Sequence, residues 1–86
     1  MVSAAEIVRF WRDAGPKAWF VRDDTFDGRC RGFEAEHHAA ARGELRAWEM
    51  DAEGALALLL LLDQIPRNIF RSSPHSFATD SLAVAV

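Results

Sequence analysis

A dense group of polar side chains directly follows the most apolar stretch of the sequence. Most of its members surround Pro66, just after five consecutive leucines at positions 58–62. An arginine can bind a carboxylate or another anion through two parallel hydrogen bonds, while amide side chains both donate and accept. The group therefore has the residue types of a polar ligand site. Its members are Asp63, Gln64, Arg67, Asn68 and, further along the chain, Asp80.

Three interpretations of this group are open. In the first, which we favour, Arg67 pairs with Asp63 or Asp80 in a buried network. The two amides, Gln64 and Asn68, then satisfy backbone groups that the proline leaves free. In the second, the arginine binds a small anionic or polar ligand, which the amides orient. In the third, one of the two carboxylates is a general base, which requires a perturbed environment and a positioned proton.

Two adjacent histidines, His37 and His38, raise the question of a metal site. Neighbouring residues of a helix point in different directions, so we do not expect both to bind one ion. His37 continues an apolar stripe of Phe26, Cys30 and Phe33 at helical spacing. Cys30 lies two turns, about 10 Å, from His37, which is too far for a nucleophile pair. We therefore predict a partly buried histidine, a buried cysteine, no metal and no cofactor.

The elements that position these residues are predicted to be helical. Residues 55–62 are apolar without a break, and unbranched leucine favours helix over strand. A helix that is apolar on all sides must be covered on every side by other segments. We predict a buried central helix at 52–64, which Asp51 caps and Pro66 ends or kinks.

Two further helices are predicted before the central one. The first begins at Ser3, because Ser3 and Glu6 have the spacing of a capping box, and it stops at Gly15. Residues 17–24 then form a connector. The second helix begins at the acidic residues of 23–24 or just after them and ends at Gly43, since glycine commonly follows the last helical residue.

The remaining segments are a link at 44–50, with one helical turn, and a fourth helix that starts near His75. This last helix ends in the apolar run 82–86 without a capping residue. An exposed apolar end is unusual in a soluble monomer. We expect either that the chain is the N-terminal part of a longer helical domain or that another chain, such as a second copy, covers this end.

Composition narrows the class of protein. The 86 residues, of which 27% are charged, have a formal charge of −3, so we expect one globular domain. Basic residues are scattered and form no stripe, which argues against nucleic-acid binding. Residues 55–62 would span about 12 Å as a helix, too short for a membrane. A single cysteine and the lack of a signal peptide favour the cytoplasm.

Several segments resemble a bacterial family that is catalogued as domain of unknown function 924. The resemblance rests on the run 61–71, Leu-Leu-Asp-Gln-Ile-Pro-Arg-Asn-Ile-Phe-Arg, on 77–83, Phe-Ala-Thr-Asp-Ser-Leu-Ala, and on shorter matches at 8–11, 19–20 and 41–45. Ile65 departs from the family, in which phenylalanine is common there. The resemblance implies a fold similar to tetratricopeptide-type helical proteins, of which this chain would be the N-terminal half. It implies no activity.

Together these observations predict an all-α fold of about four helices, arranged as stacked antiparallel hairpins. No glycine-rich phosphate loop, metal-spaced His/Cys set or nucleophile elbow occurs in the sequence. We therefore favour a cytoplasmic module that binds a protein or peptide partner, since stacked helical hairpins form curved binding surfaces. The alternative is an enzyme or small-ligand protein that uses the polar group around Pro66 together with Asp80.

Overall fold

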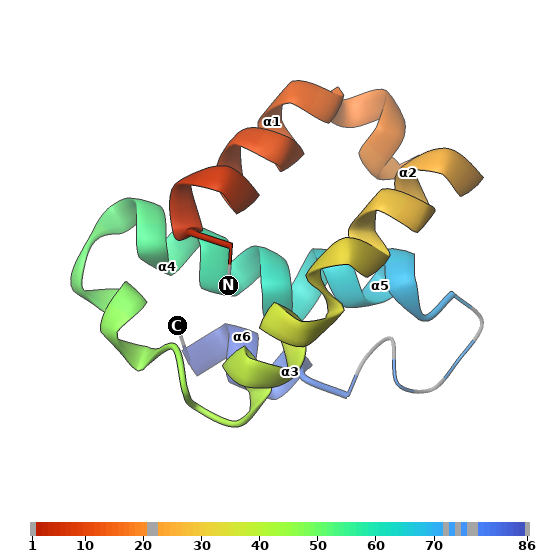
Figure 1. The fold of residues 1–86 in the computed structure, drawn as a ribbon. Coiled ribbons are helices and arrows are strands. Elements are labelled where there is room, and N and C mark those ends of the chain that lie inside the picture. Colours follow the sequence, from red (N-terminus) through yellow and green to blue (C-terminus); the bar gives the residue numbers. More distant parts are fainter. Residues whose placement is uncertain (1, 21–22, 72, 74, 76–77, 86) are drawn as a thin grey trace.

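Helices form nearly all of the structure, a computed structural model that describes residues 2–20, 23–71, 73, 75 and 78–85 (Figure 1). No strand occurs among these residues, which confirms the all-α class. In chain order the elements are α1 (Ala4–Phe20), α2 (Asp24–Cys30), η1 (Arg31–Phe33), α3 (Glu34–Ala41), η2 (Arg46–Met50), α4 (Ala52–Leu59), η3 (Leu60–Gln64), α5 (Ile65–Ile69) and α6 (Asp80–Ala85). None of the helices in this part of the chain has the length and apolar character needed to cross a membrane.

Helix α1 begins at the predicted cap and continues further than predicted. The Ser3 hydroxyl oxygen accepts the Glu6 backbone N–H at 3.2 Å. The helix bends at Gly15, whose φ of +81° is a left-handed conformation that glycine adopts easily. The prediction of a connector is wrong for residues 17–20, which form a further helical turn after Pro16. This turn is stabilised by Trp19, whose indole N–H donates to the Trp11 carbonyl at 2.7 Å.

Elements α2, η1 and α3 follow one another without a break and form the predicted second helix. Asp23 is its cap and accepts the backbone N–H groups of Thr25 and Phe26 at 3.0 and 3.1 Å. Gly43 follows its end with a φ of +80°, as expected for a residue just beyond a helix. Cys30 and His37 both have no exposed surface, so the apolar stripe faces the core.

Elements α4, η3 and α5 form one uninterrupted helix over 52–69, which we call the central segment. Asp51 caps it by accepting the Gly54 N–H at 2.7 Å. Helix α1 packs on α4, α2 packs on α5, and both α3 and α6 pack on η3, with α1 and α6 on opposite sides in Figure 1. The central position is therefore confirmed. Complete coverage is not, because Leu56 and Leu59 remain 42% and 38% exposed.

The last described helix is shorter than predicted. Helix α6 begins at Asp80 and not near His75, and its first turn is closed by the Thr79 carbonyl, which accepts the N–H groups of Leu82 and Ala83 at 3.1 Å. Ala83 is buried against the core, whereas Val84 is 88% exposed. Positions 77 and 86, which the sequence assigned to this helix or the family signature, lie outside the described residues.

Candidate functional site

The central segment passes through Pro66 without ending, which the sequence did not predict. A proline has no backbone N–H and its ring clashes with the carbonyl four residues earlier in a regular α-helix. Here residues 60–64 widen into a π-helix, and the Ile65 N–H donates to the Leu60 carbonyl, five residues back. Pro66 then lies in the first turn of α5, where its missing donor is tolerated. The prediction that the central helix ends at this proline is wrong; the regular α-helix is instead interrupted over residues 60–64 and resumes at Ile65.

This local widening leaves two carbonyls without their usual backbone donors. In a regular α-helix the Leu61 carbonyl would accept the Ile65 N–H, but that N–H donates to Leu60 here. The Leu62 carbonyl would accept from residue 66, which is a proline and has no N–H. His37 donates its Nδ1–H to the Leu61 carbonyl at 2.7 Å, and Thr79 donates its hydroxyl to the Leu62 carbonyl at 2.5 Å. Buried carbonyls need such partners. The sequence predicted that Gln64 and Asn68 would satisfy the backbone groups left free by the proline. In the structure, His37 and Thr79, which are distant in the sequence, donate to these carbonyls.

Arg67 lies between two carboxylates, as the first interpretation requires. Its guanidinium donates to Asp63 one turn earlier and to Asp80 Oδ2 at 3.0 Å. It also donates to the Asp63 backbone carbonyl at 2.9 Å, and Gln64 donates to Asp63 Oδ2 at 2.8 Å. The Arg67 side chain is 35% exposed, so the network is half-buried and joins the central segment to α6.

Asn68 belongs to a second network, which does not include Arg67. Its amide donates to Asp27 Oδ1 at 2.9 Å, and Arg71 binds both oxygens of the same carboxylate. Asp27 is 3% exposed, whereas the Arg71 side chain is 33% exposed, so the pair lies at the edge of the core and joins α2 to the end of the central segment. The hydrogen bond that Arg71 donates to the Asp27 carboxylate raises the pKa of Arg71. Sequence reasoning missed Asp27 and Arg71, which are 44 residues apart.

The three histidines of the chain meet at the surface of η3. His37, His38 and His75 each offer one ring nitrogen, and these three atoms all lie within 4.8 Å of one another. The Nε2 atoms of His37 and His75 are 3.2 Å apart. The expectation that the adjacent pair diverges is wrong, because their ring centroids are only 4.9 Å apart. His75 has no sequence signal that connects it to the pair.

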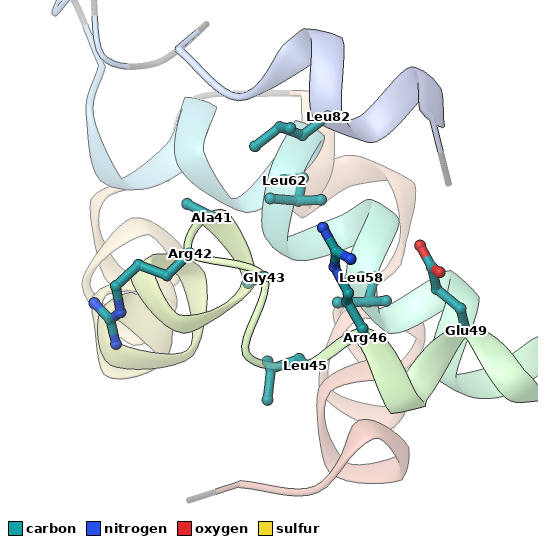
Figure 2. A pocket seen from close by; sticks show the side chains of 10 residues that line it. Ala41, Arg42, Gly43, Leu45, Arg46, Glu49, Leu58, Leu62 and Leu82 are labelled. Atoms are coloured by element: carbon teal, nitrogen blue, oxygen red, sulfur yellow. The ribbon is translucent and has the colours of Figure 1, made fainter.

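A pocket of about 290 Å³ opens between α3, η2, the central segment and α6 (Figure 2). Its apolar wall consists of Leu45, Leu58, Leu62 and Leu82. Figure 2 shows the Arg46 side chain extending between Leu58 and Leu62, with Glu49 at one edge. The polar group around Pro66 contributes no residue to this wall.

A family model described as a bacterial protein of unknown function, DUF924, matches residues 7–86 of the chain. Among solved structures, a protein of unknown function from Agrobacterium tumefaciens is 54% identical, with a TM-score of 0.88 over 92% of this chain. The match covers 46% of that protein, so the chain spans about half the length of this relative. No curated protein matches.

Proposed function

We propose that this chain, which belongs to the DUF924 family of bacterial proteins of unknown function, is a helical module that binds an acidic, apolar peptide segment of a partner protein. The binding surface is the pocket between α3, η2, the central segment and α6. The observation that supports this proposal is the side chain of Arg46, which lies at an apolar wall and has no polar partner among the described residues. A cytoplasmic location is part of the proposal.

The size and lining of the pocket fit side chains of a peptide better than a cofactor. Its volume of about 290 Å³ is at the lower end of the roughly 300–1,000 Å³ found for small-molecule sites. Leu58 and Leu62 come from successive turns of the central segment, and Leu82 from α6 faces them. Leu82 is 42% exposed, so an apolar side chain placed there would gain contact area on binding.

The charge of the pocket selects an acidic occupant. Arg42 is already bound to Glu44, with Nε–Oε2 and Nη2–Oε1 distances of 2.7 and 3.0 Å. The guanidinium of Arg46 makes no hydrogen bond or ion pair with any other described residue. A carboxylate on the peptide can accept two hydrogen bonds from this guanidinium. Glu49 at the rim disfavours a second carboxylate on that side, so one acidic group beside apolar side chains is the expected pattern.

The polar group around Pro66 supports a structural role more than a ligand site. Arg67 is held by Asp63 and Asp80, and Asn68 is held by Asp27, so the group divides between two networks that each join separate helices. We infer that both networks fix the C-terminal part of the central segment, which in turn fixes the wall of the pocket. No general base is assigned.

The test measures peptide binding by the 86-residue chain. The probe is a set of fluorescein-labelled helical peptides with leucine at positions i and i+4 and glutamate at i+3, and the readout is fluorescence anisotropy. Binding of the glutamate peptides, with about 3–10-fold weaker binding when glutamine replaces glutamate, is the expected result. Arg46→Gln should remove this preference, whereas Arg31→Gln, an exposed arginine on η1, should leave it unchanged.

Two outcomes would overturn the proposal. One is equal affinity of the parent chain and Arg46→Gln for the glutamate peptides. The other is a lack of peptide binding together with a concentration-dependent dimer in light scattering, which would assign the Leu82 surface to a second copy of the chain.

A further inference from the structure

We propose that His37, His38 and His75 form a binding site for one divalent transition-metal ion, of the class to which Zn²⁺ belongs, with a fourth position open to solvent. None of the three residues lines the peptide pocket. Its three residues are all the histidines in the sequence. They come from two segments, residues 37–38 on α3 and residue 75, that meet at the same face of the fold.

The spacing of the ring nitrogens is close to that of a tetrahedral site. Two nitrogens bound to zinc at 2.0–2.1 Å are about 3.3–3.4 Å from each other. The Nε2 atoms of His37 and His75 are 3.2 Å apart, so this pair already has the required separation. The nitrogen that His38 offers lies within 4.8 Å of both, which is close enough for a third ligand after a change of its side-chain torsion angles.

The tautomer of His37 is fixed by the backbone of the π-helix. Its Nδ1–H donates to the Leu61 carbonyl at 2.7 Å, so in the neutral ring Nε2 has a lone pair directed at His75. A hydrogen bond from the far ring nitrogen to a carbonyl is the usual support of a metal-binding histidine.

The surroundings supply an acidic neighbour and an apolar wall. Glu34 Oε1 lies 3.7 Å from His38 Nε2, one helical turn away on α3. The Phe70 ring packs against His75 with centroids 4.4 Å apart and against His37 at 5.7 Å. His37 is buried, while His38 and His75 are accessible to solvent, so an ion has a path of entry.

The donor set defines the class of metal. Three imidazole nitrogens suit zinc, copper, nickel and cobalt, whereas magnesium and calcium require oxygen ligands. Cys30 is not part of the group, because burial raises the pKa of its thiol to about 12 and its nearest histidine lies two turns along the helix. Three protein ligands with an open fourth position are the arrangement of catalytic zinc sites, in contrast to the closed four-ligand structural sites.

The test uses the full chain, without an affinity tag that contains histidine, after treatment with a chelator. Zn²⁺ alone is titrated by calorimetry, and Co²⁺ absorption reports the coordination geometry. The expected result is one ion per chain, an upward shift of the melting temperature with Zn²⁺, and a tetrahedral Co²⁺ spectrum. His75→Gln and His38→Gln should each weaken binding at least about tenfold.

The controls separate loss of a ligand from loss of the fold. His37→Gln also removes the donor to the Leu61 carbonyl, so the two more exposed histidines are the informative positions. Cys30→Ala should bind Zn²⁺ as the parent chain does. Equal Zn²⁺ affinity of the parent and His75→Gln, with native circular dichroism for both, would overturn the proposal. So would the absence of any calorimetric signal for the parent chain at millimolar Zn²⁺.

Discussion

Replacing Gly54 with alanine should destabilise the protein, although alanine is the better helix former. Gly54 lies in the first turns of α4, and a Cβ atom there would be 2.0 Å from the Trp48 carbonyl oxygen and 2.7 Å from its carbon. Both are backbone atoms of η2, so a side-chain rotation cannot relieve the overlap. The helix must move away from η2, or η2 must move away from the helix.

The magnitude follows from two opposing terms. Overpacking in a well-packed region costs about 1–3 kcal/mol, and a backbone contact this short belongs at the upper end. Higher helix propensity returns about 1 kcal/mol, so the net loss in free energy of unfolding is about 2 kcal/mol. For a domain of this size we expect the melting temperature to fall by roughly 10 °C. Because η2 contains Arg46, binding of the acidic peptide should weaken as well.

The assay is urea unfolding followed by circular dichroism, with Gly32→Ala as the matched control. No atom lies within 4 Å of the Cβ position at Gly32, which is in η1 and has no positive φ. That substitution should be neutral or stabilise by about 0.4–1 kcal/mol. If Gly54→Ala unfolds at the same or a higher urea concentration than the parent, the close approach of η2 and α4 is not a constraint and the reasoning is refuted.

Two further predictions concern charge. Arg67→Ala should lower the free energy of unfolding by about 1–2 kcal/mol. This loss is smaller than the roughly 3–5 kcal/mol expected for a fully buried pair, because Arg67 is a third exposed. The exposed control, Arg42→Ala, should have no measurable effect in the same urea assay. An Arg67→Ala variant that unfolds like the parent would exclude a stabilising network. Burial raises the pKa of the Cys30 thiol from its ordinary value near 9 to about 12. Between these two pH values, the thiol ionises in the unfolded chain but not in the folded protein. The free energy of unfolding should fall by about 1.4 kcal/mol per pH unit between roughly pH 9 and 12, and Cys30→Ala should remove most of this slope. The sequence contains no tyrosine, a residue that would titrate in the same pH range. Equal slopes in the two proteins would contradict it.

Local chemistry explains which features of the fold could be predicted from the sequence. Ser3, Asp23 and Asp51 cap helices through hydrogen bonds within three residues, so their roles depend only on nearby sequence. Gly43 ends a helix through its own φ. The apolar stripe of α2 and α3 and the central position of the leucine run follow from periodicity and from burial of apolar surface.

The features that could not be predicted depend on contacts between distant residues. The turn at 17–20 is helical because Trp19 bonds Trp11 across the Gly15 bend. Asp27 and Arg71 pair over 44 residues, and the sequence spacing of such a pair contains no signal. The group of three histidines was missed for a related reason, since helix directions relate His37 to His38 only and say nothing of the third ring, which residue 75 brings to them.

Pro66 connects the candidate sites to one another. Because this residue has no N–H, residues 60–64 widen and the carbonyls of Leu61 and Leu62 need side-chain donors. The first donor is His37, which thereby directs its Nε2 at His75. The second donor is Thr79, which directly precedes α6. Its position therefore brings Asp80, the first residue of α6, to the guanidinium of Arg67.

The consequence is that the histidine site and the arginine network share a single structural cause. A donor at position 66 would allow the carbonyl of Leu62 to bond within the helix, and Thr79 would lose its partner. Helix α6 also supplies Leu82 to the peptide pocket, so the pocket wall depends on the same backbone irregularity. Residues 60–66 therefore influence the histidine group, the Arg67 network and the pocket, although the polar side chains around Pro66 mainly bind other helices.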